Sequence, residues 1–147
     1  MRAVVTRVRS ASVTIDGREH GAIETGLLVL LGVGPEDTEE TTRRMADKVC
    51  ALRIFSDEAG KMNLNLASVQ GALLVVSQFT LYANTKSRRP GFTGAAAPDL
   101  ANRLYEEFLS ACTALGHPPQ HGEFGAEMQV ASVNDGPVTI LFDSNEW

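Results

Sequence analysis

Two short segments of the 147-residue chain are almost continuously apolar. They are Leu27–Val33 and Ala72–Ser77. A half-exposed strand alternates apolar and polar residues, whereas a strand that is covered on both faces is apolar throughout. Both segments are also much shorter than the roughly 18 apolar residues that a membrane-spanning helix needs. We therefore expect two central strands of a β-sheet, each covered on both faces.

Further strands are expected at Arg2–Arg9, which is rich in valine with interleaved polar residues, and at Ser12–Ile15, which alternates. Three more are expected at Arg53–Phe55, Gln129–Val133 and Val138–Phe142. The pair Asp16-Gly17 is a favoured two-residue hairpin turn. The segment Asn134–Pro137 contains Gly and Pro and predicts a tight connection between the last two strands.

Two helices are predicted from apolar spacing of i, i+4 and i+7 and from the residues at their ends. For Asp37–Ala51 we expect Asp37 to cap the first turn, with Glu40 three residues later as in a capping box. The second helix, Pro98–Leu115, begins with a proline and is followed by Gly116, which is typical of helix ends.

The predicted strands and helices do not alternate regularly, so the pattern does not indicate a parallel βαβ fold. We expect an α+β fold in which a mixed or antiparallel, barrel-like β-sheet carries the two helices. A chain of 147 residues fits a single domain spanning 1–147.

Net charge and cysteine content limit the classes of protein to which the chain can belong. The chain has 13 Lys and Arg against 18 Asp and Glu, a net charge of -5. Proteins that hold nucleic acid by bulk electrostatics are basic, so composition alone disfavours a broad nucleic-acid interface. Cys50 and Cys112 lack CxxC spacing and fit core positions of a reduced, cytoplasmic protein.

No cofactor or metal site is predicted. The chain has neither a GxGxxG nor a GxxxxGK[ST] motif. His117 and His121 are four residues apart, but Pro118 and Pro119 lie between them and prevent a shared helical face. The three hydroxyls Ser77, Thr80 and Ser87 lie outside any GxSxG elbow, and side-chain chemistry alone favours hydroxyls that bond to nearby backbone.

Two loop features allow two interpretations each. Lys86, Arg88 and Arg89 fall within four residues of an otherwise acidic chain. They form either a solvated surface loop or a phosphate-contacting patch beside a pocket. Gly136-Pro137 forms either an ordinary turn or a cis peptide bond, since roughly 5–6% of X-Pro bonds in folded proteins are cis.

Two segments closely resemble the signature motifs of the D-aminoacyl-tRNA deacylases. They are Ser77-Gln78-Phe79-Thr80-Leu81-Tyr82 and Asn134-Asp135-Gly136-Pro137-Val138-Thr139. The first residues of the chain and segments 52–55, 61–63 and 88–92 are similar to that family as well, so the resemblance covers essentially the whole chain. The departures are small: Gly91 stands where Ser is expected, and Asn65 is less typical.

The resemblance implies hydrolysis of the ester between a D-amino acid and the 3′-terminal adenosine of tRNA, and also clearance of glycine from mischarged tRNA. It implies a cytoplasmic homodimer with active sites at the subunit interface and no cofactor. Ser77 and Gln78, together with Phe79 and Thr80, are expected to line the adenosine and aminoacyl pocket. A cis Gly136-Pro137 of one subunit is expected to reach into the pocket of the other and to reject L-amino acids.

The resemblance leaves the catalytic group open. An aminoacyl ester is already activated, so main-chain N–H groups near Phe79 and Thr80, with the substrate's own 2′-OH, are sufficient for catalysis and are the preferred interpretation. The alternative is Thr80 as a nucleophile. The patch of Lys86, Arg88 and Arg89 is expected to contact the end of the tRNA acceptor stem.

Three rival functions remain at this point. One is a non-enzymatic module that binds tRNA or protein, and another is a small hydrolase that uses Thr80 or Ser77 on a metabolite ester. The third is a relative with relaxed chirality that keeps Gly136-Pro137 in trans.

Overall fold

The long first strand organises the sheet in the computed structural model, which describes residues 1–147. Along one edge, β1 (Arg2–Ile15) pairs antiparallel with β8 (Gln129–Asp143). Along its other edge, the first half of β1 pairs with β3 (Gly26–Gly32) and the second half with β2 (Arg18–Ile23). The expected strands at 2–9 and 12–15 are thus one continuous strand with three partners.

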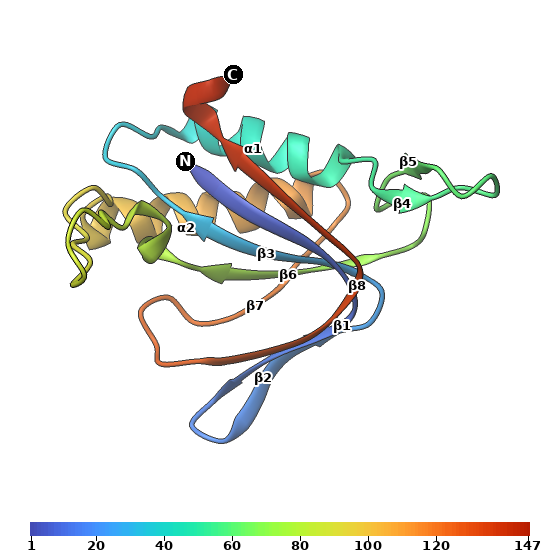
Figure 1. Cartoon of the computed structure of the whole chain (residues 1–147), viewed down its shortest axis with the longest axis horizontal. Coiled ribbons are helices and arrows are strands. Elements are labelled where there is room, and N and C mark those ends of the chain that lie inside the picture. The colour runs from blue at the N-terminus through green and yellow to red at the C-terminus, as the bar shows by residue number, and fades with distance from the viewer.

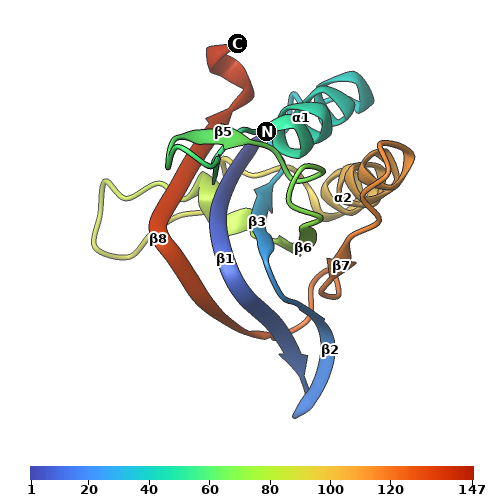
Figure 2. The ribbon, with the colours of Figure 1, turned by 90° about the vertical axis from the view of Figure 1, so that its right-hand side faces the viewer.

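The sheet continues beyond β3 with parallel pairs, so it is mixed. β3 pairs in parallel with β6 (Ala72–Ser77), and β6 pairs in parallel with the two-residue β7 (Gln120–His121). Figures 1 and 2 show the sheet bending strongly along β1 and β8, so that it curls into an incomplete barrel. The predicted α+β fold with a barrel-like mixed sheet is confirmed.

Both helices, α1 (Glu39–Ala51) and α2 (Pro98–Ala114), pack on the same face of the sheet (Figure 2). The main core, 23 buried residues, lies between that face and the helices. A second cluster of seven buried residues fills the opposite, curled side of the sheet. β3 contributes Leu27 and Val29 to the first cluster and Leu28 to the second, so this central strand is covered on both faces as predicted.

Two buried polar contacts connect the helices to each other and to the sheet. The Tyr105 hydroxyl of α2 donates a hydrogen bond to the Val75 carbonyl of β6 at 3.2 Å. Cys50 of α1 and Cys112 of α2 are buried free thiols, as expected, and their mutual hydrogen bond together with burial raises the pKa of Cys112.

Neither helix has the length and apolar character that crossing a membrane requires.

The predicted cap of the first helix is wrong. The N-cap of α1 is Thr38, whose side chain accepts a hydrogen bond from the Thr41 amide at 3.2 Å. The Asp37 carboxylate instead accepts bonds at 2.6 Å from the Met1 ammonium and from the Gly34 amide. Asp37 therefore binds the Met1 ammonium, which is distant in sequence, instead of capping the helix that directly follows it.

The predicted tight connection at Asn134–Pro137 is also wrong. β8 is one strand, and both of its halves pair with β1 in the same direction. Val8 pairs with Asn134 and Thr6 pairs with Thr139, so residues 135–138 lie opposite the single residue Arg7. The segment is an enlarged β-bulge within a strand rather than a turn between two strands.

The remaining elements are short. The strand expected at Arg53–Phe55 is displaced, and the two-residue β4 (Phe55–Ser56) pairs with β5 (Met62–Leu64), which was not predicted. A 3-10 helix, η1 (Phe79–Tyr82), follows β6, and another, η2 (Ser144–Glu146), ends the chain.

We expect Gly26→Ala to destabilise the protein by about 2–3 kcal/mol, because the contact between β3 and β6 leaves no room for a side chain. A Cβ at Gly26 would overlap the Ala72 carbonyl oxygen and lie 2.8 Å from its carbonyl carbon and amide nitrogen. Gly91→Ala is the matched control, since nothing lies within 4 Å of its added Cβ. Chemical denaturation of both variants measures the difference, and equal stability would contradict the close β3–β6 contact.

Candidate active site

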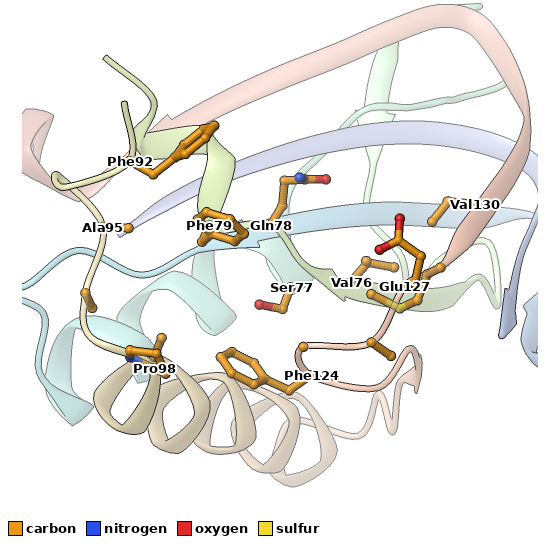
Figure 3. Close-up of a pocket in the computed structure, with 15 residues that line it drawn as sticks. Val76, Ser77, Gln78, Phe79, Phe92, Ala95, Pro98, Phe124, Glu127 and Val130 are labelled. Atoms are coloured by element: carbon orange, nitrogen blue, oxygen red, sulfur yellow. The ribbon is translucent and has the colours of Figure 1, made fainter. Parts of the chain in front are cut away.

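A cavity of about 700 Å³ opens at the carboxyl end of β6 (Figure 3). Its walls come from five segments: the end of β6, the start of η1, the loop before α2, the first turn of α2, and the chain from Phe124 to Val130. Ten of its 15 lining residues are hydrophobic. Volume and lining are both typical of sites that hold a small organic ligand.

The segment from Ser77 to Thr80 places backbone groups at this cavity. The Gln78 amide donates to the Leu31 carbonyl at 2.8 Å, which extends the pairing of β6 with β3 by one residue. The chain then turns into η1, where the Leu81 amide bonds back to the Gln78 carbonyl at 3.2 Å. The first amides of a helix have no acceptor within the helix, and here they belong to Phe79 and Thr80.

Of the predicted pocket residues, Ser77, Gln78 and Phe79 line the cavity and Thr80 does not. The Thr80 hydroxyl oxygen accepts a hydrogen bond from Nε2 of Gln78. A side-chain amide donates but cannot take up a proton, so this partner is not a general base.

Contacts with the first strand hold η1 in place. Nη1 of Arg2 donates to the Leu81 carbonyl at 2.8 Å, and the Arg2 guanidinium lies 4.5 Å from the centre of the Tyr82 ring. Burial, with a smaller contribution from the negative charge of Asp37, raises the pKa of Tyr82 to about 12. Arg2 contacts both of the last two residues of η1, Leu81 through the main chain and Tyr82 through its ring.

Two exposed aromatic rings border the cavity. Phe79 of η1 and Phe92 meet edge to face, with ring centres 5.3 Å apart and an interplanar angle of 73°. Their residues are 54% and 38% exposed. Exposed aromatic rings beside an apolar cavity are typical of a binding surface.

The basic residues Lys86, Arg88 and Arg89 occupy a projecting loop next to Phe92. Paired hydrogen bonds between Asn84 and Gly91, at 2.7 and 2.9 Å, close the neck of this loop, which we call the basic hairpin (residues 84–91). Figure 1 shows it extending from one end of the molecule. All three cations are exposed and none forms an ion pair. They lie outside the cavity wall.

Gly136 and Pro137 lie elsewhere, on the exposed bulge of β8, and do not line the cavity. The peptide bond between them is cis, and Gly136 has a φ of +121°. Arg7, across the bulge, donates to the carbonyls of Asp135 at 3.2 Å and Ile54 at 2.7 Å. The two motifs that are distinctive in the sequence are thus separated in one copy of the chain.

Sequence reasoning missed two parts of this arrangement. One is the cavity wall formed by Phe124, Glu127 and Met128, which belongs to no recognisable motif. The other is Arg7, and here a signal was present, because it is a charged residue within a valine-rich strand. The molecule has no group of three or more His, Cys, Asp or Glu side chains placed to hold a metal ion.

Comparison with known proteins assigns the family. The family model described as D-Tyr-tRNA(Tyr) deacylase matches residues 4–143. The D-aminoacyl-tRNA deacylase of Thermosipho africanus is 54% identical over 147 residues and that of Lacticaseibacillus casei 57% identical over 145 residues, covering 99% and 98% of each chain, respectively. A solved structure named c-Myc DNA unwinding element binding protein superposes with a TM-score of 0.92 at 42% identity, covering 97% of this chain and 98% of the other. The chain belongs to the D-aminoacyl-tRNA deacylases, a family of enzymes.

Proposed function

We propose that the chain, acting as one domain over residues 1–147, hydrolyses the ester between a D-amino acid and the 3′-terminal adenosine of tRNA in the cytoplasm. The products are the free D-amino acid and tRNA. Family membership supports the activity, and the observation that carries it is the cavity at the end of β6 with the Ser77–Thr80 segment at its edge. Its volume of about 700 Å³ accommodates an aminoacylated nucleoside.

The main-chain amides of Phe79 and Thr80 are the proposed catalytic groups. They stabilise the oxyanion that develops when water attacks the ester carbonyl, while Ser77 and Gln78 hold the adenosine and aminoacyl groups. The substrate's 2′-OH assists the reaction, since it lies next to the scissile ester. This assignment is supported by the hydrogen bond from Gln78 to Thr80, which supplies no base to activate the Thr80 hydroxyl.

The active enzyme is proposed to be a homodimer whose sites are shared between subunits. β8 pairs only with β1, so its outer edge is unpaired along a 15-residue strand. Val133 and Leu141 of this strand are 55% and 77% exposed. A long edge strand with exposed apolar side chains favours association with another chain. In a dimer with a two-fold axis, the same contact covers this edge in both subunits. This copy would supply Gly136 and Pro137 to the cavity.

Chiral selection follows from the same arrangement. In the proposed dimer, the carbonyl oxygens of the partner's Gly136 and Pro137 accept the α-ammonium of the substrate. With the ammonium and the ester both fixed, an L side chain points into the turn and clashes, whereas a D side chain points away from it. Glycine has no side chain to reject, so glycine attached to a non-cognate tRNA is also hydrolysed.

The basic hairpin is proposed to contact the phosphates of the acceptor stem. Lys86, Arg88 and Arg89 are exposed, free of ion pairs and next to Phe92 at the cavity. The whole chain carries a net charge of -5, but three local cations are enough for a short phosphate contact. The contact must also be weak enough for the tRNA to leave after each turnover.

We expect Gly136→Ala to abolish hydrolysis of D-tyrosyl-tRNA. A Cβ on Gly136 would lie 2.9 Å from Nη2 of Arg7 and from Cγ2 of Val138, at a φ of +121° that L-residues rarely adopt, so the turn must move. Gly60→Ala is the matched control, because its φ of +79° is also positive and nothing lies within 4 Å of its added Cβ. Full activity of Gly136→Ala would contradict the proposed role of the turn.

Mixing of two inactive variants tests whether the sites are shared. Ala95→Trp fills the cavity, since Ala95 lines it, but leaves the turn intact. Random mixing with an equal amount of Gly136→Ala subunits makes about half of the dimers mixed. Each mixed dimer has one intact site and one inactive site. We therefore expect the mixture to recover about a quarter of wild-type activity. No recovery in a mixture shown to contain mixed dimers would contradict a shared site.

We expect Thr80→Ala and Thr80→Val to retain D-tyrosyl-tRNA hydrolysis within about tenfold of the wild type, since the hydroxyl forms no covalent intermediate. The valine variant preserves side-chain shape and so separates packing from chemistry. A loss of about 10⁴-fold in both folded variants, in single-turnover assays, would identify Thr80 as the nucleophile.

We expect simultaneous replacement of Lys86, Arg88 and Arg89 by Ala to raise KM for D-tyrosyl-tRNA. The slope of log K against log salt should become shallower by about 2–3, because three phosphate contacts are lost. Hydrolysis of the small ester D-tyrosyl-adenosine should not change, because it lacks the stem. Replacement of Arg18 and Lys61, exposed cations on other elements, is the control. Unchanged tRNA binding would show that the hairpin is ordinary surface.

A further inference from the structure

Glu127 is the only charged residue among those that line the cavity. It lies on the chain between β7 and β8, is exposed, and takes part in no ion pair. An exposed carboxylate facing an otherwise uncharged cavity is open to a hydrogen-bond donor of a ligand, and none of the catalytic steps proposed above uses it.

The neighbours of Glu127 are suited to a flat ring. Met128, which is half-buried, and Val76 of β6 line the cavity together with Glu127. Phe124 lines it on the side of α2, near Pro98 (Figure 3). Thioethers contact planar aromatic groups favourably. Figure 3 shows the Glu127 carboxylate at the end of the cavity across from Phe92, with Ser77 and Gln78 between the two ends.

The position of Glu127 indicates which hydrogen-bond donor of the substrate it contacts. This step rests on the proposed function. A D-aminoacyl-adenosine offers an α-ammonium, a ribose hydroxyl and the exocyclic amine of adenine. The ammonium is attached one carbon away from the ester carbonyl, so it stays beside the amides of Phe79 and Thr80. The base is attached on the far side of the ribose and reaches the other end of the cavity.

We propose that Glu127 recognises the terminal nucleobase by accepting a hydrogen bond from the exocyclic amine of adenine, with the ring held against Met128 and Val76. A carboxylate accepts hydrogen bonds but donates none. It therefore favours a base with an amine at this position and disfavours one with a carbonyl oxygen, such as hypoxanthine. Glu127 thus determines specificity for the leaving nucleoside, while the reacting atoms are handled elsewhere.

The decisive experiment compares the binding of adenosine and inosine, measured by calorimetry or NMR titration. These nucleosides differ in the exocyclic amine, which inosine replaces by a carbonyl. We expect the wild-type protein to favour adenosine at least about tenfold, the discrimination typical of one good base contact. In Glu127→Ala the preference should fall to near unity. Glu127→Gln should give an intermediate ratio, since an amide both accepts and donates.

Glu123→Gln is the matched control, because Glu123 lies on the same segment, is exposed, and does not line the cavity. It should keep the wild-type ratio. The same variants are then assayed on D-tyrosyl esters of adenosine and inosine, where Glu127→Ala should raise KM for the adenosine ester with kcat little changed.

The inference is overturned if wild-type protein binds inosine as well as adenosine, or if Glu127→Ala weakens both nucleosides equally. It is also overturned if Glu127→Ala impairs D-tyrosyl-adenosine but not the corresponding 2-hydroxy acid ester, since the carboxylate would then serve the ammonium. If the wild-type protein hydrolyses neither tyrosyl ester, the proposed function fails, and the binding ratios still decide the role of Glu127.

Discussion

Strand β1 forms hydrogen-bonded pairs along most of its length on both edges, and the positions of both sequence motifs depend on it. On one edge, β3 and then β6 carry the chain to Ser77 and the cavity. On the other edge, β8 carries Gly136 and Pro137. Three strand spacings of about 4.8 Å separate β8 from β6, roughly 14 Å across the sheet. This separation supports the proposal that a site built from both motifs takes one of them from a second chain.

The bulge that presents Gly136 is held by contacts with one residue of β1. Arg7 faces four residues of β8, and its side chain is only 11% exposed. Its guanidinium satisfies the carbonyls of Asp135 and Ile54 and lies 3.4 Å from the Asp135 carboxylate. A guanidinium with this many acceptors is held in a fixed orientation, because its planar donors bind in fixed directions. It leaves little room beside Gly136, so the turn is supported from the sheet side while its other side faces solvent.

The parts of the fold that follow from local pattern were predictable, and the parts set by distant partners were not. Almost continuous apolar runs identified β3 and β6 as central strands, and both faces of each strand are buried. Asp37 resembled a helix cap, but its carboxylate binds the Met1 ammonium, 36 positions away in the sequence. The sequence of residues 134–137 suits a turn and a bulge equally well, and only pairing with β1 decides between them. Of the site, Ser77, Gln78 and Phe79 were found by motif, whereas Glu127 is brought to the cavity by the path of the chain before β8.

The distribution of charge reconciles an acidic chain with a polyanionic substrate. Of the negative side chains, only Glu127 lines the cavity, while the unpaired cations Lys86, Arg88 and Arg89 stand on a hairpin outside it. In the proposed complex, the phosphates of the substrate would contact cations, and the amine of its terminal base would contact a hydrogen-bond acceptor. The net charge of -5 would oppose contact with the rest of a tRNA and so limit the proposed contact to its end. For an enzyme that must release a long polyanion after cutting one ester bond, a small basic contact outside a cavity that holds no cation would favour turnover over affinity.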